Sequence, residues 1–482
     1  MKYESVIGLE VHAQLLTESK VFCGCSTKFG GAPNHNVCPV CAGFPGVLPV
    51  VNKRAIEFAI KAGLATHCEI ARSSVLARKN YFYPDLPKGY QISQYENPVG
   101  ARGFVDIELD GVTKRVRLTR IHLEEDAGKT IHDAHGDSSL VDLNRAGVPL
   151  LEIVSEPDMS SRQEANAYLR NLRAILQYLA ICDGNMEEGS FRCDANVSVR
   201  PEGSKALGTK IEIKNLNSFR AVERALEFEI ERQTDVLAGG GKLIQETRLW
   251  DEQRAETRSM RSKESAHDYR YFPDPDLLPL VIADAWIEEI RATLPELPAR
   301  RKRRFISEYG LPTYDAELLT SRKDIADYFE AAVKIHANPK ALSNWIVGDL
   351  FRVLKERRLD EQLSISAWPV SPARLAEMVQ LIDQGKISGK IAKAIFEEML
   401  DSSNTPEQIV SDKGLEQVSD LSSIEAAIDL VLASSTKQIA QYRAGNEKVF
   451  GFLVGQVMKA THGRANPQRV NEVLREKLKT DA

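Results

Sequence analysis

The stretch RLTRIHLEEDAGK, residues 117–129, decides how the first half of this chain folds. Its residues alternate as in a β-strand, so Leu123 and Glu125 point to one face and His122 and Glu124 to the other. The strand ends in three consecutive acids just before a glycine. Carboxylate oxygens at a strand end are the ligands that Mg²⁺ prefers. The alternative is a solvated acidic turn, because charged residues are mostly exposed.

Length and composition indicate a globular protein of the cytoplasm. A chain of 482 residues predicts two or three domains with real hydrophobic cores. Hydrophobic residues make up 43% and charged residues 27%, and no apolar run reaches the roughly 18 residues that a membrane span needs. The N-terminus enters a strand pattern at once, so we expect no signal peptide and no membrane contact.

Other strand-like segments also carry acids. In residues 5–15, Glu10 and His12 share one face, and Glu152 stands in an otherwise apolar strand, where a charge is costly unless it is paired or metal-bound. Two further strands, 190–201 and 209–216, add Asp194 and Glu212. Acids on several strands suit a cleft in which Mg²⁺ ions hold ATP, with salt bridges across a half-exposed sheet as the alternative. The candidate magnesium and ATP ligands are Glu10, His12, Glu124, Glu125, Glu152, Asp194 and Glu212.

Four cysteines form two close pairs in a glycine-bearing loop. They follow a C-x-C and a C-x-x-C pattern separated by twelve residues, at Cys23, Cys25, Cys38 and Cys41. In a reducing compartment this spacing predicts a structural zinc site rather than disulfides. The other three cysteines, Cys68, Cys182 and Cys193, are scattered and are interpreted as small buried hydrophobes.

Two segments rich in aromatic or basic residues are predicted to be loops. Residues 78–95, RKNYFYPDLPKGYQISQY, contain Tyr81 and Lys88, which together with Glu125 are the candidate catalytic residues. Residues 245–279 carry several arginines, which suit phosphate binding, with ordinary surface charge as the alternative.

Helices dominate the second half of the chain. Two helices are predicted earlier, at 161–180 and 219–237, and from residue 293 onward nearly every segment has a helical pattern. We predict a sheet domain over 1–292 with its zinc loop at 23–41, a helical domain over 293–405 and a small helical domain over 406–482. Residues 437–482 hold nine Lys or Arg against four acids, a charge of +5 that suits a polyanion, with a solvated helix face as the alternative.

The longest motifs together resemble a known family, the B subunit of the tRNA-dependent aspartyl/glutamyl amidotransferase. The matching segments are VIGLEVHAQL, the two cysteine pairs, RKNYFYPDLPKGYQISQY, HLEEDAGK, NRAGVPLLEIVSEPD, RCDANVSVRP, EIKNLNSF, MRSKESAHDYRYFPDPDL and YRAGNEKVFGFLVGQVMKATHGRANP. The resemblance covers the whole chain. It implies an α+β protein with an antiparallel-sheet cradle similar to glutamine synthetase, an all-α domain and a tRNA-binding tail.

The resemblance also implies an activity, that of a glutamine-hydrolysing carbon–nitrogen ligase. ATP phosphorylates the side-chain carboxylate of misacylated aspartyl-tRNA(Asn) or glutamyl-tRNA(Gln), and ammonia displaces the phosphate. The chain has no amidase-type sequence of its own, so an A subunit supplies ammonia, and a small C subunit completes a heterotrimer. The tail residues predicted to contact tRNA are Arg443, Lys448, Lys459, Arg464 and Arg469.

A rival hypothesis is a tRNA-binding scaffold without catalysis, in which the acids are structural. Weak binding of Mg²⁺ and ATP would favour it.

Overall fold

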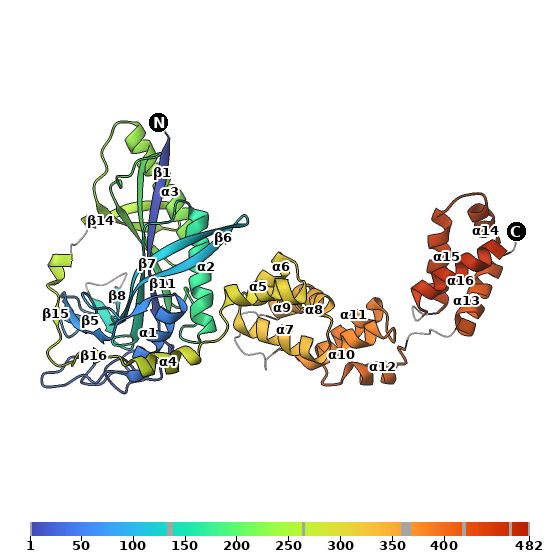
Figure 1. Cartoon of the computed structure of the whole chain (residues 1–482), viewed down its shortest axis with the longest axis horizontal. Helices are drawn as coiled ribbons and strands as arrows, with labels where there is room; N and C mark the ends of the chain where they lie inside the picture. Colours follow the sequence, from blue (N-terminus) through green and yellow to red (C-terminus); the bar gives the residue numbers. More distant parts are fainter. Residues whose placement is uncertain are drawn as a thin grey trace. The chain divides into compact units, whose positions relative to one another are not determined.

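The computed structural model describes residues 2–132, 138–262, 266–357, 368–416, 421–461 and 465–480. The chain divides into two compact units, Met1–Pro298 and Ala299–Ala482. The first combines a large sheet with helices, and the second is helical throughout its described residues (Figure 1). The predicted order, a sheet domain followed by helices, is confirmed.

Within the described residues, nine strands form one sheet in the order β14-β13-β12-β11-β1-β10-β7-β6-β2. Neighbouring strands run antiparallel except β12 and β13, which run parallel. The strands, in sheet order, are β14 Glu256–Ser262, β13 Glu246–Asp251, β12 Ile211–Leu216, β11 Phe191–Pro201, β1 Tyr3–Gln14, β10 Pro149–Ser155, β7 Val112–Glu125, β6 Gly100–Leu109 and β2 Glu69–Ile70.

Shorter strands form three small sheets beside the large one. A three-stranded sheet has the order β15-β4-β5, and two further sheets have two strands each, β16-β3 and β8-β9. Their bounds are β15 Phe272–Pro273, β4 Ala77–Asn80, β5 Tyr90–Ser93, β16 Leu280–Val281, β3 Ser73–Ser74, β8 Lys129–His132 and β9 Ser139–Asp142. A short 3₁₀ helix, η1, spans Ala266–Tyr269.

One face of the large sheet is apolar and covered by helices. Val11, Ile153 and Ile121 lie side by side on β1, β10 and β7, and all three are fully buried. This is the alternation that the sequence predicts. The helices of this unit, three of which pack on this face, are α1 Lys53–Ala65, α2 Arg162–Tyr178, α3 Phe219–Ala238 and α4 Asp284–Ala292.

Capping residues fix where the two longer helices of this unit begin. Ser161 accepts a hydrogen bond from the backbone of Glu164 at the start of α2, and Ser218 caps α3 in the same way. These starts agree with the sequence prediction. The prediction that residues 245–279 are loops is wrong for β13 and β14, which form the edge of the large sheet. The prediction of a loop over 78–95 is likewise wrong at its two ends, where β4 and β5 pair as strands of the small sheet.

A buried carboxylate ties α3 to those two strands. Glu229 is fully buried and accepts a hydrogen bond of 2.7 Å from the hydroxyl of Thr257 on β14. Arg248 of β13 lies 3.5 Å from the same carboxylate, and Arg232 binds it from the next turn of the helix. Burial of this charge is tolerable because it is paired and hydrogen-bonded.

The second unit contains two separate hydrophobic cores in its described residues. The first core includes Phe305 and extends to Ile409 and Val410, and the second begins at Ile424. The helices are α5 Pro298–Tyr309, α6 Thr313–Thr320, α7 Lys323–Ile335, α8 Pro339–Asn344, η2 Trp345–Leu350 (a π-helix), α9 Phe351–Glu356, α10 Pro372–Asp383, α11 Gly389–Met399, α12 Pro406–Lys413, α13 Leu421–Ser434, α14 Thr436–Arg443, α15 Lys448–Ala460 and α16 Pro467–Thr480.

The division of the helical half at residue 406 stays a prediction. The buried residues Ile409 and Val410 of α12 pack in the first core. No helix among the described residues is both long and apolar enough to cross a membrane.

A cluster of paired charges joins α5 and α7. The guanidinium of Arg301, whose residue is only 6% exposed, lies 2.7 Å from Asp327 and also binds Glu330. Arg304 lies 2.7 Å from the second oxygen of Glu330. Each acid in this cluster therefore contacts an arginine directly.

Candidate functional site

The polar face of the large sheet carries a cluster of histidines and carboxylates at its centre. His12 on β1 pairs with Glu152 on β10, which pairs with His122 on β7, so the three side chains share one face. Glu124 lies two residues beyond His122 on that face. We call His12, His122, Glu124 and Glu152 the acid–histidine cluster.

Distances within the acid–histidine cluster are longer than those of closed hydrogen bonds. Nε2 of His12 lies 3.4 Å from Glu152 and 3.9 Å from Glu124. Nε2 of His122 lies 3.4 Å from Glu152 and 3.7 Å from Glu124. Arg120 approaches Glu152 to 3.6 Å, and the hydroxyl of Ser93 lies 3.2 Å from Glu124.

Each ionisable group of this cluster shifts the pKa values of its neighbours. Burial opposes the charge of His12, but Glu152 raises its pKa above the ordinary value, and the same balance raises the pKa of His122 to about 9. Burial also opposes ionisation of Glu152, yet His122 and His12 hold its pKa well below the ordinary value. The pKa of Glu124 is lowered against its burial, chiefly by His122. Both acids are therefore ionised at neutral pH.

Three members of the cluster can share one metal ion. One ligand atom from each of His12, Glu124 and Glu152 lies within 4.8 Å of the other two. Carboxylate oxygens suit a hard cation such as Mg²⁺, and the imidazole also suits Mn²⁺ or Zn²⁺. The donor set therefore fits a divalent cation.

The remaining predicted magnesium and ATP ligands lie elsewhere. Glu10 is on the same face and accepts a hydrogen bond of 2.8 Å from Asn196. Asp194 and Glu212 lie 2.7 and 3.8 Å from the ammonium of Lys214. Burial lowers the pKa of Lys214, but these two acids more than reverse the effect. This acid–lysine group occupies β11 and β12, beside the acid–histidine cluster.

Glu125 belongs to a different group from its neighbour Glu124. Its carboxylate binds the ammonium of Lys88 and accepts a hydrogen bond of 2.8 Å from the backbone of Ile92. The pair borders a cavity of about 110 Å³. Gly43 lines the same cavity with φ +69°, and a Cβ there would lie 2.6 Å from Cγ of Lys88, so only glycine fits this approach.

Tyr81, the third candidate catalytic residue, directly follows β4. Burial raises its pKa, and the charges of Glu124, Asp85 and Glu125 raise it further. Its hydroxyl therefore stays protonated at neutral pH and can donate a hydrogen bond. The ring of Tyr269 packs edge-on against it, with centroids 6.2 Å apart.

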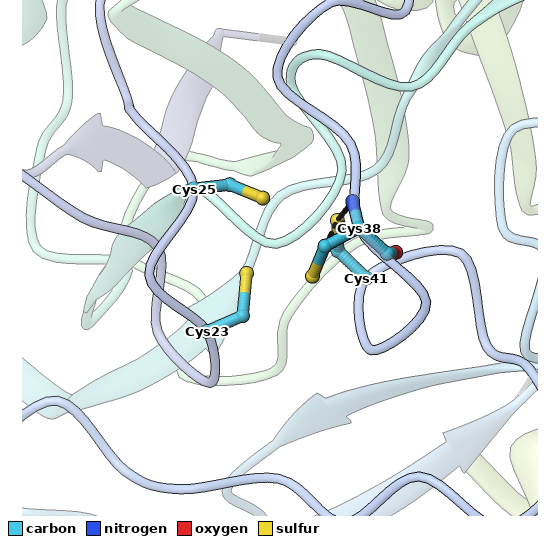
Figure 2. Close-up of side chains that lie close together, drawn as sticks. All are labelled: Cys23, Cys25, Cys38 and Cys41. Carbon is cyan, nitrogen blue, oxygen red and sulfur yellow. Dashed lines mark hydrogen bonds between the residues drawn. The ribbon is translucent and has the colours of Figure 1, made fainter.

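The four cysteines of the predicted zinc loop come together. Cys23 and Cys25 lie on one loop and face Cys38 and Cys41 on the next (Figure 2). One sulfur from each lies within 4.8 Å of the others, and the sulfurs of Cys38 and Cys41 are 3.9 Å apart. Four thiols at this spacing fit the closed tetrahedral coordination of a structural zinc ion.

A buried lysine supports the cysteine cluster. Lys20 is 1% exposed, and its ammonium donates to the carbonyls of Asn36 (2.7 Å) and Leu143 (3.2 Å). It also lies 3.5 Å from the sulfur of Cys41. A hydrogen bond with Cys23 and the charge of Lys20, opposed by burial, lower the pKa of Cys41 to about 4. The cavity described above runs from these residues to the Lys88–Glu125 pair.

The predicted tRNA contacts lie on the last three helices, except one. Arg443 ends α14, Lys448 and Lys459 lie at opposite ends of α15, and all three are exposed. Arg469 on α16 is exposed and pairs with Glu472 at 3.1 Å. Arg464 lies outside the described residues.

Sequence reasoning did not select His122 and Asp126 as site residues. His122 shares a face with Glu124 in the first stretch quoted, so the alternation of the strand was enough to predict that His122 lies in the same site. Asp126 is 4% exposed and binds Arg192 at 3.0 Å, with Arg145 at 3.5 Å. That arrangement depends on strand pairing across 66 residues, which local sequence does not reveal.

Comparison with known proteins gives consistent similarities over both halves of the chain. Residues 5–288 match the family model described as the GatB/GatE catalytic domain, and residues 327–478 match the GatB domain. The chain is 60% identical over 481 residues to the B subunit of the aspartyl/glutamyl-tRNA(Asn/Gln) amidotransferase from Geotalea uraniireducens, covering 99% of this chain and 100% of the relative. The proteins of the same name from Geobacter sulfurreducens (60% over 482 residues, 99% and 100%) and Carboxydothermus hydrogenoformans (57% over 480 residues, 99% of each) are similar.

Proposed function

The chain belongs to the GatB family of amidotransferase B subunits, and from that premise we propose that it carries out ATP-dependent transamidation of misacylated tRNA. The substrates are aspartyl-tRNA(Asn), glutamyl-tRNA(Gln) or both. The side-chain carboxylate is phosphorylated, and ammonia then displaces the phosphate to give asparaginyl- or glutaminyl-tRNA. The sheet unit acts as a cradle of the glutamine synthetase type.

The acid–histidine cluster is the observation that carries this proposal. Two buried carboxylates and a histidine offer ligand atoms within 4.8 Å of one another, at the centre of a polar sheet face. A divalent cation held by His12, Glu124 and Glu152 would neutralise phosphate charge. Such a site serves phosphoryl transfer, and it distinguishes an enzyme from a scaffold whose acids are all paired with fixed cations.

The chemistry explains why the site needs both positive charge and a base. A carboxylate is a poor acyl donor, so its oxygen first takes the terminal phosphoryl group of ATP and ADP leaves. Ammonia then attacks the acyl carbon, phosphate leaves, and the nitrogen loses a proton. Glu125, whose carboxylate binds Lys88, is the candidate acceptor for that proton. Tyr81 can donate a hydrogen bond, and Asp194 and Glu212 lie near the ATP.

Ammonia must reach this site from another protein. We propose an amidase-type A subunit as its source and a small C subunit as the third member of the complex. The proposal rests on the family and on the sequence, in which no amidase-type segment is found.

One assay tests the function directly. The chain is assembled with its A and C partners and given glutamine, ATP and each misacylated tRNA in turn, and amide formation is measured. Glu125→Gln keeps the shape of the side chain and should slow the reaction by on the order of 10²-fold or more, as loss of one transition-state contact does. Glu288→Gln, on the exposed side of α4, is the matched control. An unchanged rate for Glu125→Gln would remove this residue from the mechanism.

The cysteine cluster is proposed to hold one structural zinc ion. A chain carrying both Cys38→Ser and Cys41→Ser should bind less than one zinc per chain and lose thermal stability, because the metal folds the loop. Cys182→Ser, at a buried cysteine outside the cluster, should keep its zinc. Metal analysis that found one zinc per chain in the double variant would refute the assignment.

The second half of the chain is proposed to bind tRNA through its last helices. Arg443, Lys448, Lys459 and Arg469 are exposed there, and Lys or Arg on helices contact phosphates without reading bases. Truncation after residue 416 leaves the first helical core complete. It should weaken tRNA binding and flatten its salt dependence, by about 0.7 to 0.9 in log–log slope for each lost phosphate contact. An unaltered slope would show that these residues are a solvated surface.

A further inference from the structure

Four tyrosines gather in the sheet unit, close to the acid–histidine cluster. Tyr95 and Tyr271 are stacked, with centroids 4.5 Å apart and planes 10° from parallel. Tyr269 packs edge-on against Tyr271 at 6.1 Å and against Tyr81 at 6.2 Å. Tyr95 and Tyr81 flank β5, whereas the other two come from a segment nearly 200 residues later in the chain. The fold therefore builds an aromatic surface from distant segments.

Hydrogen bonds hold these two segments together. The amide of Asn80, at the end of β4, donates to the carbonyls of Tyr269 (3.2 Å) and Arg270 (2.9 Å). Ser93, two residues before Tyr95, contacts Glu124 at 3.2 Å. The aromatic surface therefore borders the acid–histidine cluster.

An ammonium group lies against one of these rings. The nitrogen of Lys79 is 5.0 Å from the centre of the Tyr269 ring, within cation–π range. Its charge also helps to lower the pKa of Glu124. A flat ring, a cation and a divalent-cation site are the features that bind the base, the phosphates and the metal of a nucleotide.

Packing alone does not account for these tyrosines. None of Tyr95, Tyr269 and Tyr271 belongs to a hydrophobic core of the described residues. Tyr95 is 44% exposed although it is stacked. A stacked pair that keeps one ring open to solvent can receive a further ring.

We propose that Tyr95, Tyr269 and Tyr271 form a stacking site for the adenine ring of a substrate, with Lys79 beside it as a partner for phosphate. This inference rests on the proposed function, which uses two substrates that carry adenine. One is ATP, and the other is the 3′-terminal adenosine of the aminoacyl-tRNA. Tyrosine rings stack on bases in either setting.

The test compares ligand pairs that differ only in the adenosine. With the assembled complex, the affinity for ATP is compared with that for inorganic tripolyphosphate, both with Mg²⁺. The affinity for uncharged tRNA ending in CCA is compared with that for the same tRNA ending in CC. The variants are Tyr95→Ala and Tyr271→Ala, with Tyr95→Phe and Tyr271→Phe as conservative partners. Tyr314→Ala, at a 70% exposed tyrosine of the helical unit, is the matched control.

In the alanine variants we expect one of the two affinity gaps to shrink by on the order of 10-fold, the size of a lost base–aromatic stack. A smaller ATP gap assigns the site to ATP, and a smaller CCA gap assigns it to the tRNA end. The phenylalanine variants should keep the gap because the ring remains.

Unchanged gaps in both alanine variants would overturn the inference, and so would an equal loss in the phenylalanine variants, because the hydroxyl would then be the active group. Thermal unfolding of each variant shows that the fold is intact. These affinities are measured without turnover. A complex that forms no amide from either tRNA would instead refute the proposed function.

Discussion

Two clusters of charge differ in how their acids are neutralised: the acid–histidine cluster of the sheet unit, whose acids are buried, and the arginine–acid cluster of the helical unit, whose acids are only partly buried. In the helical unit, Asp327 and Glu330 contact arginines at 2.7 Å or closer. In the sheet unit, Glu124 and Glu152 are 3% and 8% exposed but face histidines at 3.4 Å or more.

The difference separates a structural ion-pair network from a candidate site. In the helical cluster every acid already contacts an arginine, so binding of a further cation would bring little stabilisation. Where the nearest partners are titratable histidines at long distance, an added cation improves the balance of charge. Burial of charge alone therefore does not identify a functional site, and the closeness of its partners must be considered as well.

The largest expected effect is a loss of activity when the acid–histidine cluster is changed. Glu152→Gln removes one charge and keeps the shape, so amide formation by the assembled complex should fall by on the order of 10² to 10³-fold. The thermal midpoint should fall only slightly, because His12 and His122, whose pKa values Glu152 raises, can release their protons once its charge is gone. Rate and melting temperature are measured on the same preparation.

A contrary result would be a marked loss of stability in Glu152→Gln with activity retained. The two clusters would then be of the same structural kind.

The next effect is a loss of stability when the helical cluster of Arg301, Arg304, Asp327 and Glu330 is changed. Arg301→Met leaves Asp327 and Glu330 partly buried without their main partner, and should destabilise this unit by about 2 to 3 kcal/mol. This lies below the full cost of an unpaired buried charge, because Arg304 still binds Glu330. Hydrogen exchange of α5 and α7 measures the loss.

Amide formation at permissive temperature should stay near the wild-type rate in Arg301→Met. A hundredfold drop there, with normal exchange protection, would place the helical cluster in the active machinery.

The smallest effect concerns pH. Burial opposes ionisation of Glu330, but Arg304 and Arg301 hold its pKa below the ordinary value of 4.5. Because the folded pKa is lowered, the stabilisation is present above pH 4.5 and is lost as pH falls through the folded value. Glu330→Gln should flatten this part of the pH–stability curve by less than about 1 kcal/mol, since water still reaches the pair. Urea unfolding between pH 3 and pH 6 compares the two proteins, and parallel curves would mean that the ion pair contributes nothing.

The fold was predictable wherever one face of a strand or helix is apolar. β1 and β7 show clear alternation, and α2 and α3 begin within one residue of the predicted helix starts at 161 and 219. β13 and β14 were predicted as loops because their arginines and glutamates hide the alternation. They form strands at the sheet edge, where only a few side chains, such as Trp250 at 1% exposure, need to be buried.

It was harder to predict which site residues lie together than which residues belong to the site. Glu124 and Glu125 are adjacent in sequence, yet one contacts histidines and the other Lys88. His12 meets Glu152 only through the register of β1 on β10, which pairs residues 140 positions apart. Lys20 gave no signal, because a lone lysine in sequence is ordinarily exposed.

The parallel pairing of β12 and β13 has a consequence for the order of folding. Two parallel neighbours cannot be joined by a tight turn, so the chain must travel back along the sheet between them, and here it does so as α3. The contacts of Glu229 with Thr257 and Arg248 require that this helix and both later strands are in place. The antiparallel centre can assemble without them. We therefore expect the β13–β14 edge to gain protection last when the chain refolds, and to open first when it is strained.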